Sequence, residues 1–228
     1  MFTLSSVVPW GRSYAEYVRM FALSPADLEG RILGCGDGPA SFNVEATQRG
    51  SHVTSCDPLY RFDATQIRQR IDETSAKVLE QARLNAHEFV WDDAIPDVET
   101  LGRVRMHAMT TFLVDYERGW REGRYLDAEL PAMPFAENSF DLALCSHFLF
   151  LYSQQHDAAF HIQSMRELCR VAREVRVFPL LALGSRPSPY VGPVRAALEA
   201  DGRIVTIERV PYEFQRGGDE MMRVTRAP

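Results

Sequence analysis

The chain has 228 residues, a formal net charge of −6 and an apolar fraction of 46%. This length and composition are typical of a single globular domain, here residues 1–228, and they exclude a disordered or fibrous protein. Because the net charge is negative, no overall positive field exists to attract nucleic acid or an anionic membrane surface, and we expect neither as a partner.

The cysteines and the first residues bear on the cellular compartment. Four cysteines contain no CxxC pair, which favours free thiols in a reducing compartment over disulfides or a zinc site. We therefore predict no metal. The N-terminal stretch MFTLSSVVPWGR lacks a basic leader, and no apolar run reaches the length of a membrane span. We expect a cytoplasmic protein, and the sequence does not indicate its oligomeric state.

The first predicted unit is a strand, a glycine-rich turn, a helix and a second strand. A short apolar strand covers residues 31–35, a helix continues to about Gly50, and the second strand, residues 52–56, ends at Asp57 and Pro58. Such a unit builds a parallel, doubly wound sheet, which binds ligands at the carboxyl ends of its strands.

A helical insert is predicted after the second strand. Apolar residues recur at helical spacing over residues 64–89 and again over residues 98–116, and a short third strand follows at residues 124–127. An ordinary crossover between two strands would need far fewer residues. We therefore assign residues 61–123 to an insert that acts as a lid or as part of the acceptor site.

The second half of the chain returns to alternating strands and helices. Strands are predicted at residues 140–145, 174–181, 203–210 and 220–225, and helices at residues 157–172 and 191–200. A hairpin makes the last two strands antiparallel to each other. The expected fold is α/β: a doubly wound, mostly parallel, seven-stranded Rossmann-like sheet with a terminal antiparallel hairpin.

The glycine cluster ILGCGDGPASF does not match a dinucleotide-binding loop. The GxGxxG pattern needs a glycine where Pro39 stands, and Asp37 would place a negative charge where a pyrophosphate binds. An NAD-dependent oxidoreductase is therefore the less favoured interpretation. A nucleoside cofactor without phosphates fits the loop better.

Four motifs in order resemble those of the class I S-adenosylmethionine-dependent methyltransferases: residues 32–38, Asp57, residues 133–144 and residues 167–171. The resemblance extends from Arg31 to Thr225 and implies S-adenosylmethionine as cofactor and methyl transfer to an acceptor, which we expect to be a small molecule. The family usually has an acidic residue where Gly34 stands. This departure leaves a catalytically inactive cofactor-binding or interaction protein as an alternative.

The resemblance also assigns cofactor-binding residues. It implies that the glycine loop passes beneath the cofactor, that Asp57 accepts hydrogen bonds from the ribose hydroxyls, and that Pro58 lies against the adenine. Glu129 and Leu130 fall where the family contacts the adenine edge, with Asp127 as the alternative in a shifted register. The full predicted set is Gly34, Cys35, Gly36, Gly38, Asp57, Pro58, Glu129, Leu130 and Cys145.

Candidate catalytic and accessory residues each allow a structural alternative. His147 follows the fourth predicted strand and is the predicted catalytic residue, because an imidazole can take a proton from a nucleophile. The alternative is a histidine that is hydrogen-bonded to nearby backbone. Asp37 either touches the cofactor or caps the next helix. Tyr14 and Tyr17 either shield the sulfonium or belong to a packing helix. The loop 184–190 is expected to shape the acceptor site.

Overall fold

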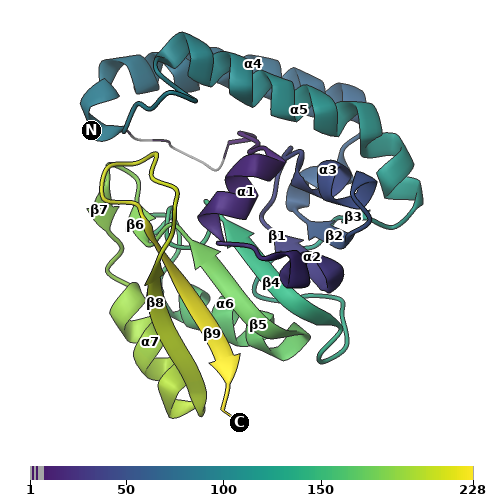
Figure 1. Ribbon diagram of the computed structural model, residues 1–228, viewed down its shortest axis with the longest axis vertical. Helices are drawn as coiled ribbons and strands as arrows, with labels where there is room; N and C mark the ends of the chain where they lie inside the picture. Colours follow the sequence, from purple (N-terminus) through teal and green to yellow (C-terminus); the bar gives the residue numbers. More distant parts are fainter. Residues whose placement is uncertain (1, 3, 5–7, 228) are drawn as a thin grey trace.

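The computed structural model describes residues 2, 4 and 8–227, and its centre is one seven-stranded sheet (Figure 1). The strand order is β3-β2-β1-β4-β5-β9-β8, and β9 runs antiparallel to its neighbours β5 and β8 while the other pairs are parallel. The strands are β1 (Arg31–Cys35), β2 (His52–Cys56), β3 (Tyr125–Leu126), β4 (Phe140–Ser146), β5 (Ala172–Phe178), β8 (Arg203–Arg209) and β9 (Glu220–Arg226). This topology confirms the predicted α/β fold class.

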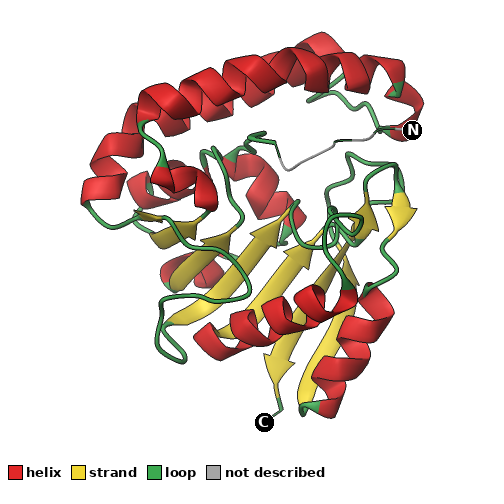
Figure 2. Ribbon diagram, turned by 180° about the vertical axis from the view of Figure 1, so that it is seen from behind, coloured by secondary structure: helices red, strands yellow, loops and turns green. Residues whose placement is uncertain are grey.

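Helices cover both faces of the sheet and the end at which its parallel strands finish. Figures 1 and 2 show α6 and α7 on one face and α1, α2 and α3 on the other, while α4 and α5 lie side by side across the end where the parallel strands finish. The helices are α1 (Tyr14–Met20), α2 (Pro25–Glu29), α3 (Phe42–Gln48), α4 (Ala64–Leu84), α5 (Val98–Arg121), α6 (Ala158–Val171) and α7 (Val191–Ala200).

Element boundaries follow the predictions closely in the sheet and less closely in the insert. The predicted helix 64–89 ends at Leu84 and is followed by a single 3-10 turn, η2 (Ala86–Glu88), whereas the predicted helix 98–116 continues to Arg121. The strand predicted at 174–181 is β5, which ends at Phe178. Pro179 follows, and because proline has no N–H it cannot extend the ladder. The next residues form a separate hairpin of β6 (Leu181–Ala182) and β7 (Arg186–Pro187).

Burial on both faces explains why the central strands read as continuous apolar runs. In β1, Leu33 and Cys35 join the cluster that packs against α6 and α7, while Ile32 joins the cluster that contains residues of α1 and α3. A parallel sheet covered by helices on both sides has this pattern. The rigid sheet therefore fixes where its strands end, and those ends form the site described below.

One buried carboxylate ties the N-terminal helix to the insert and to the C-terminal part of the chain. Ser13 and Glu16 form a capping box at the start of α1. The Glu16 carboxylate also accepts hydrogen bonds from Arg105 Nη1 of α5 at 2.5 Å and from the Tyr212 hydroxyl at 2.8 Å. Burial would raise the pKa of Glu16, but the guanidinium groups of Arg105 and Arg12 lower it to about 2.

We expect Arg105→Met to lower the free energy of unfolding by about 3 to 5 kcal/mol, because it removes the partner of a buried charge. Urea denaturation at pH 7 measures this change. Arg103 lies exposed on the same helix, so Arg103→Met is the matched control and should change stability by less than about 0.5 kcal/mol. Equal effects of the two substitutions would contradict the role given to the Glu16–Arg105 pair.

Candidate functional site

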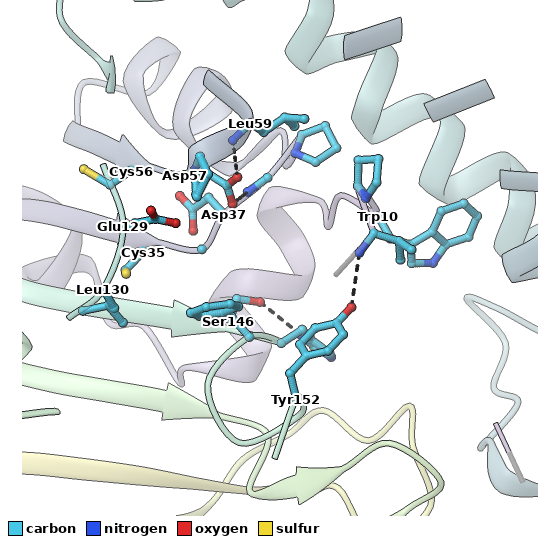
Figure 3. A pocket seen from close by; sticks show the side chains of 18 of the residues that line it. Trp10, Cys35, Asp37, Cys56, Asp57, Leu59, Glu129, Leu130, Ser146 and Tyr152 are labelled. Atoms are coloured by element: carbon cyan, nitrogen blue, oxygen red, sulfur yellow. Dashed lines mark hydrogen bonds between the residues drawn. The ribbon is translucent and has the colours of Figure 1, made fainter. Parts of the chain in front are cut away.

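A cavity of about 510 Å³ lies at the carboxyl ends of β1, β2 and β4 (Figure 3). Its walls come from these strand ends, the N-terminal segment, the first turns of α4 and the loop after β3. This volume is within the range of small-molecule binding clefts. The predicted residues that line it are Cys35, Gly36, Gly38, Asp57, Pro58, Glu129, Leu130 and His147.

Two predicted residues do not line this cavity. Gly34 lies beneath the Asp37 side chain. Cys145 is fully buried in β4, opposite Cys35 of β1, and the next residue, Ser146, takes its expected place in the cavity wall. The predicted position of Cys145 at the strand end was therefore one residue too early.

Asp57 joins the two loops that follow β1 and β2. Its Oδ2 accepts a hydrogen bond from the Gly38 N–H at 2.9 Å, and its Oδ1 accepts one from the Leu59 N–H at 2.8 Å. The Tyr60 hydroxyl donates to the Gly38 carbonyl at 2.7 Å. Enclosure raises the pKa of Asp57 to about 6, although these amide donors favour its charged form. The carboxylate is held in place at the rim of the glycine loop.

The glycine loop leaves room for side chains of the protein itself. A Cβ at Gly34 would overlap Oδ2 of Asp37, and a Cβ at Gly36 would lie 2.8 Å from Cβ of Phe148. Gly36 and Gly38 also have positive φ angles of 67° and 52°, which favour glycine. Close packing and backbone conformation, rather than only the approach of a ligand, therefore require these glycines.

Asp37 does not cap the helix that follows the loop, so that interpretation is wrong. Ser41 is the N-cap residue of α3. The Asp37 carboxylate instead accepts hydrogen bonds from the Tyr17 hydroxyl at 2.7 Å and the Ser55 hydroxyl at 2.6 Å. Since Ser55 is the register partner of Gly34, this carboxylate lies in the space that an acidic side chain at position 34 would enter.

Burial raises the pKa of Asp37 to about 6, the two hydroxyl donors lower it, and the neighbouring Asp57 raises it further. The cavity therefore carries two enclosed carboxylates, Asp37 and Asp57, and the exposed Glu129 on its outer wall. Arg12, Arg61, Arg70 and Glu73 also line the cavity, so groups of both charges face it. The two enclosed carboxylates lie at the glycine loop, where they favour a cationic group and oppose a pyrophosphate.

His147 is held firmly at the end of β4. Its backbone has a positive φ of 50°, and its N–H donates to the Phe178 carbonyl at 2.7 Å. Its ring Nδ1 lies 3.0 Å from the Ser146 hydroxyl oxygen. Enclosure and the nearby guanidinium groups of Arg12 and Arg105 hold the pKa of His147 well below its usual range, so the ring is neutral at pH 7.

The adenine-edge alternatives occupy different positions. Glu129 and Leu130 line the cavity. Asp127 instead forms an exposed ion pair with Arg61, with an N–O distance of 3.1 Å, and it is absent from the lining. The register that places Glu129 at the site is therefore the one adopted.

The N-terminal segment contributes Trp10, Arg12 and Tyr17 to the cavity wall, whereas Tyr14 does not line the cavity. Tyr14 packs under the Arg49 guanidinium, and Tyr17 stacks on Phe42 with ring centroids 4.4 Å apart. A Cβ at Gly11 would overlap the Pro39 carbonyl, so only glycine allows this segment to pack so closely on the glycine loop. The pair Pro9 and Gly11 is therefore the sequence signal that could have indicated this contact.

The residues of the loop 184–190 line neither this cavity nor the smaller one beside it. Arg186 and Pro187 form β7, which pairs with β6, and the Ser188 hydroxyl lies 2.7 Å from that of Ser153. The expected contribution of this loop to the acceptor site stays a prediction.

Among residues 2, 4 and 8–227, no cluster of three or more histidine, cysteine or acidic side chains has a metal-binding arrangement. Over the same residues, no helix has both the length and the apolar character needed to cross a membrane.

We predict that Asp37→Asn becomes more stabilising, relative to wild type, as the pH rises. In wild type the folded state binds more protons than the unfolded state between pH 4 and pH 6, because folding raises the Asp37 pKa from 3.8 to about 6. Stability from this group therefore falls as the pH rises through that window, by up to about 3 kcal/mol. Asparagine does not titrate and removes this loss.

Urea denaturation of both proteins from pH 4 to pH 7 measures the difference. Asp72→Asn, an exposed substitution on α4, is the control and should show no comparable trend. A difference between wild type and Asp37→Asn that stays constant over this pH range would contradict the raised pKa.

Comparison with known proteins gives distant similarities. No protein-family model matches the chain. It is 29% identical over 224 residues to a protein of Methanocaldococcus jannaschii that is described as uncharacterised, and the match covers 98% of each chain.

Solved structures with a similar arrangement include magnesium protoporphyrin IX methyltransferase from Synechocystis PCC 6803 with bound S-adenosylmethionine. It is 12% identical, with a TM-score of 0.49, over 94% of this chain and 78% of that one. An S-adenosylmethionine-dependent methyltransferase from Aquifex aeolicus is 14% identical, with a TM-score of 0.44, over 92% of this chain and 90% of that one.

The fold itself is identified by its own topology. The sheet is mostly parallel with a terminal antiparallel pair, as expected, and its strand order is β3-β2-β1-β4-β5-β9-β8. The chain therefore has a doubly wound, Rossmann-like α/β fold.

Proposed function

We propose that the protein is an S-adenosylmethionine-dependent methyltransferase that acts on a small molecule. The observation that carries this proposal is the position of Asp57. Its carboxylate ends β2, accepts the Gly38 N–H at 2.9 Å and lines a cavity of about 510 Å³. A carboxylate in this position is suited to accept hydrogen bonds from two neighbouring sugar hydroxyls.

The lining fits each part of this cofactor. Pro58 and Leu130 would contact the adenine, with Glu129 at its edge, and Asp57 would hold the ribose. Asp37, at the other end of the glycine loop, would accept a hydrogen bond from the amino group of the methionine part. When bound, the cofactor supplies a methyl group activated by a positively charged sulfur. The carboxylates of Asp37 and Asp57 beside the glycine loop favour such a cation and disfavour the pyrophosphate of NAD.

Asp37 takes the place of the acid that is missing at Gly34. Its carboxylate fills the space over Gly34, and the Tyr17 and Ser55 hydroxyls hold it there. The missing acid was the reason for considering a catalytically inactive protein. With a carboxylate supplied from position 37, that reason no longer applies.

His147 is the proposed proton acceptor. It lines the cavity, and its ring is neutral because enclosure and the nearby guanidinium groups lower its pKa. A neutral imidazole can accept a hydrogen bond from an O–H or N–H nucleophile and orient it. The same guanidinium groups disfavour the imidazolium, so His147 is a weak base that removes the proton only as the methyl group is transferred. The fixed backbone orients the ring, so positioning of the nucleophile contributes together with proton removal.

We expect calorimetric titration to show binding of S-adenosylmethionine and S-adenosylhomocysteine. Asp57→Asn should weaken both by about 10- to 100-fold, because each hydrogen bond to a charged group contributes roughly 1.5 to 3 kcal/mol. The exposed Asp72→Asn should leave the affinities unchanged. The proposal fails if neither compound binds the folded protein at millimolar concentration, or if NADH binds instead.

A reciprocal exchange of residues tests the role of Asp37. Asp37→Ala should weaken S-adenosylhomocysteine about tenfold or more, since a charged hydrogen bond is lost, without affecting 5′-methylthioadenosine, which lacks the amino-acid end. The double variant Gly34→Asp/Asp37→Ala should regain affinity, because the acid then projects from β1 into the same space.

Gly34→Asp alone is the informative comparison in this series. It places two carboxylates in one buried space, so it should destabilise the protein, and Asp37→Ala should correct the defect. If Asp37→Ala bound both ligands as tightly as wild type, Asp37 would have no role in holding the cofactor.

A further inference from the structure

We propose that a second, smaller cavity beside the first holds a compact alkyl part of the methyl acceptor, and that a carboxylate of the acceptor binds Arg12. This inference rests on the proposed function of the larger cavity. The two cavities share the side chains of Val8, Trp10, Arg12, His147 and Tyr152, so a molecule in the smaller cavity lies directly beside the cofactor site.

The smaller cavity is apolar and small. Its volume is about 80 Å³, and its walls come from the N-terminal segment, the insert, the loop after β4 and the segment before β9. A cavity of about 150 Å³ holds a benzene molecule, so this one suits a branched alkyl group of about three or four carbons. Its apolar lining residues include Val78, Ala82, Phe89, Leu101, Leu151, Leu183 and Phe214.

Arg12 is a buried cation with unused hydrogen-bonding capacity. It is only 8% exposed and lies in the wall that the two cavities share. Its Nη1 donates to the Trp10 carbonyl at 2.9 Å, whereas its Nε has no partner among the described residues. A buried guanidinium next to a cavity, with a donor left over, is suited to bind an anion.

The charge balance around Arg12 also indicates that this residue binds an anion. Arg105, 0% exposed, is close enough to lower the pKa of Arg12, and its Nε and Nη2 have no partner in the described part of the chain. The nearby Glu16 carboxylate already accepts from Arg105, Tyr212 and Ser13. Two buried cations thus share one carboxylate, and an uncompensated buried charge is costly.

The chemistry of the cavity assigns the anion to the acceptor. A carboxylate at Arg12 has two possible sources, the acceptor and the amino-acid end of the cofactor. The remainder of the smaller cavity is apolar, so it suits an alkyl body and not a zwitterion. A molecule with its alkyl part among Val78, Ala82 and Leu101 meets a cationic group at Arg12, which lines the same cavity.

The test is calorimetry on the full chain loaded with S-adenosylhomocysteine. Isovalerate should bind at least tenfold more tightly than isovaleramide, its uncharged counterpart. Arg12→Gln should abolish this preference and change the affinity for S-adenosylhomocysteine less than twofold. Arg195 is exposed on α7 and lines neither cavity. Arg195→Gln is therefore the matched control and should behave as wild type.

A second variant keeps the test independent of Arg12. Ala82→Leu narrows the cavity, and it should weaken isovalerate at least fivefold while acetate binds as in wild type. Circular dichroism melting verifies that both variants are folded.

The alternative outcomes separate the two proposals. If Arg12→Gln weakens S-adenosylhomocysteine more than tenfold and leaves 5′-methylthioadenosine unchanged, Arg12 holds the carboxylate of the cofactor and this inference is overturned. Equal binding of isovalerate and isovaleramide to wild type also overturns it. If S-adenosylhomocysteine does not bind, the proposed function fails and the smaller cavity is no acceptor pocket; the carboxylate preference measured on the unloaded protein then shows separately whether Arg12 binds an anion.

Discussion

The hydrogen bond between the Asp57 carboxylate and the Gly38 N–H is the contact on which the site depends. It joins the loops at the carboxyl ends of β1 and β2 in a rigid parallel sheet. It also places the Asp57 carboxylate, a hydrogen-bond acceptor, beside Gly36 and Gly38, which both have positive φ angles. Every other proposed cofactor contact is placed relative to this pair. Because the sheet is packed on both faces, the spacing between the two strand ends is fixed by the core.

The Asp37 carboxylate occupies the space over Gly34, and this contact connects the glycine loop to the N-terminal helix. A carboxylate over Gly34 is held by hydroxyl groups from α1 and β2, and the glycine is needed because any side chain there would overlap it. The N-terminal helix thereby becomes part of the site, since Tyr17 belongs to α1. The same helix carries Glu16, which connects it to the insert through Arg105.

The sequence predicted the sheet and the position of the site well, for physical reasons. Strands buried on both faces, such as β1, give continuous apolar runs, and the glycine loop and Asp57 lie directly at their ends, where the fold places ligands. Boundaries in the insert were less accurate, because capping and packing decide where α5 ends. His147 and Glu129 line the cavity as expected, and their roles remain proposals.

Contacts between distant parts of the chain could not be read from local pattern. Arg12 and Trp10 reach the cavity only because the N-terminal segment packs over the loop at Pro39, and the hydroxyls that hold Asp37 come from positions 17 and 55. The helix-cap alternative for Asp37 was therefore wrong, and Cys145 was placed one residue too early. Local spacing carries no information about such tertiary partners.

A crystal structure of the protein grown with S-adenosylhomocysteine tests the central claim most directly. The account predicts the ribose hydroxyls within hydrogen-bonding distance of Asp57 and the amino group of the ligand on Asp37 above Gly34. A ligand bound elsewhere, or one whose sugar and amino group both avoid these two carboxylates, would contradict it.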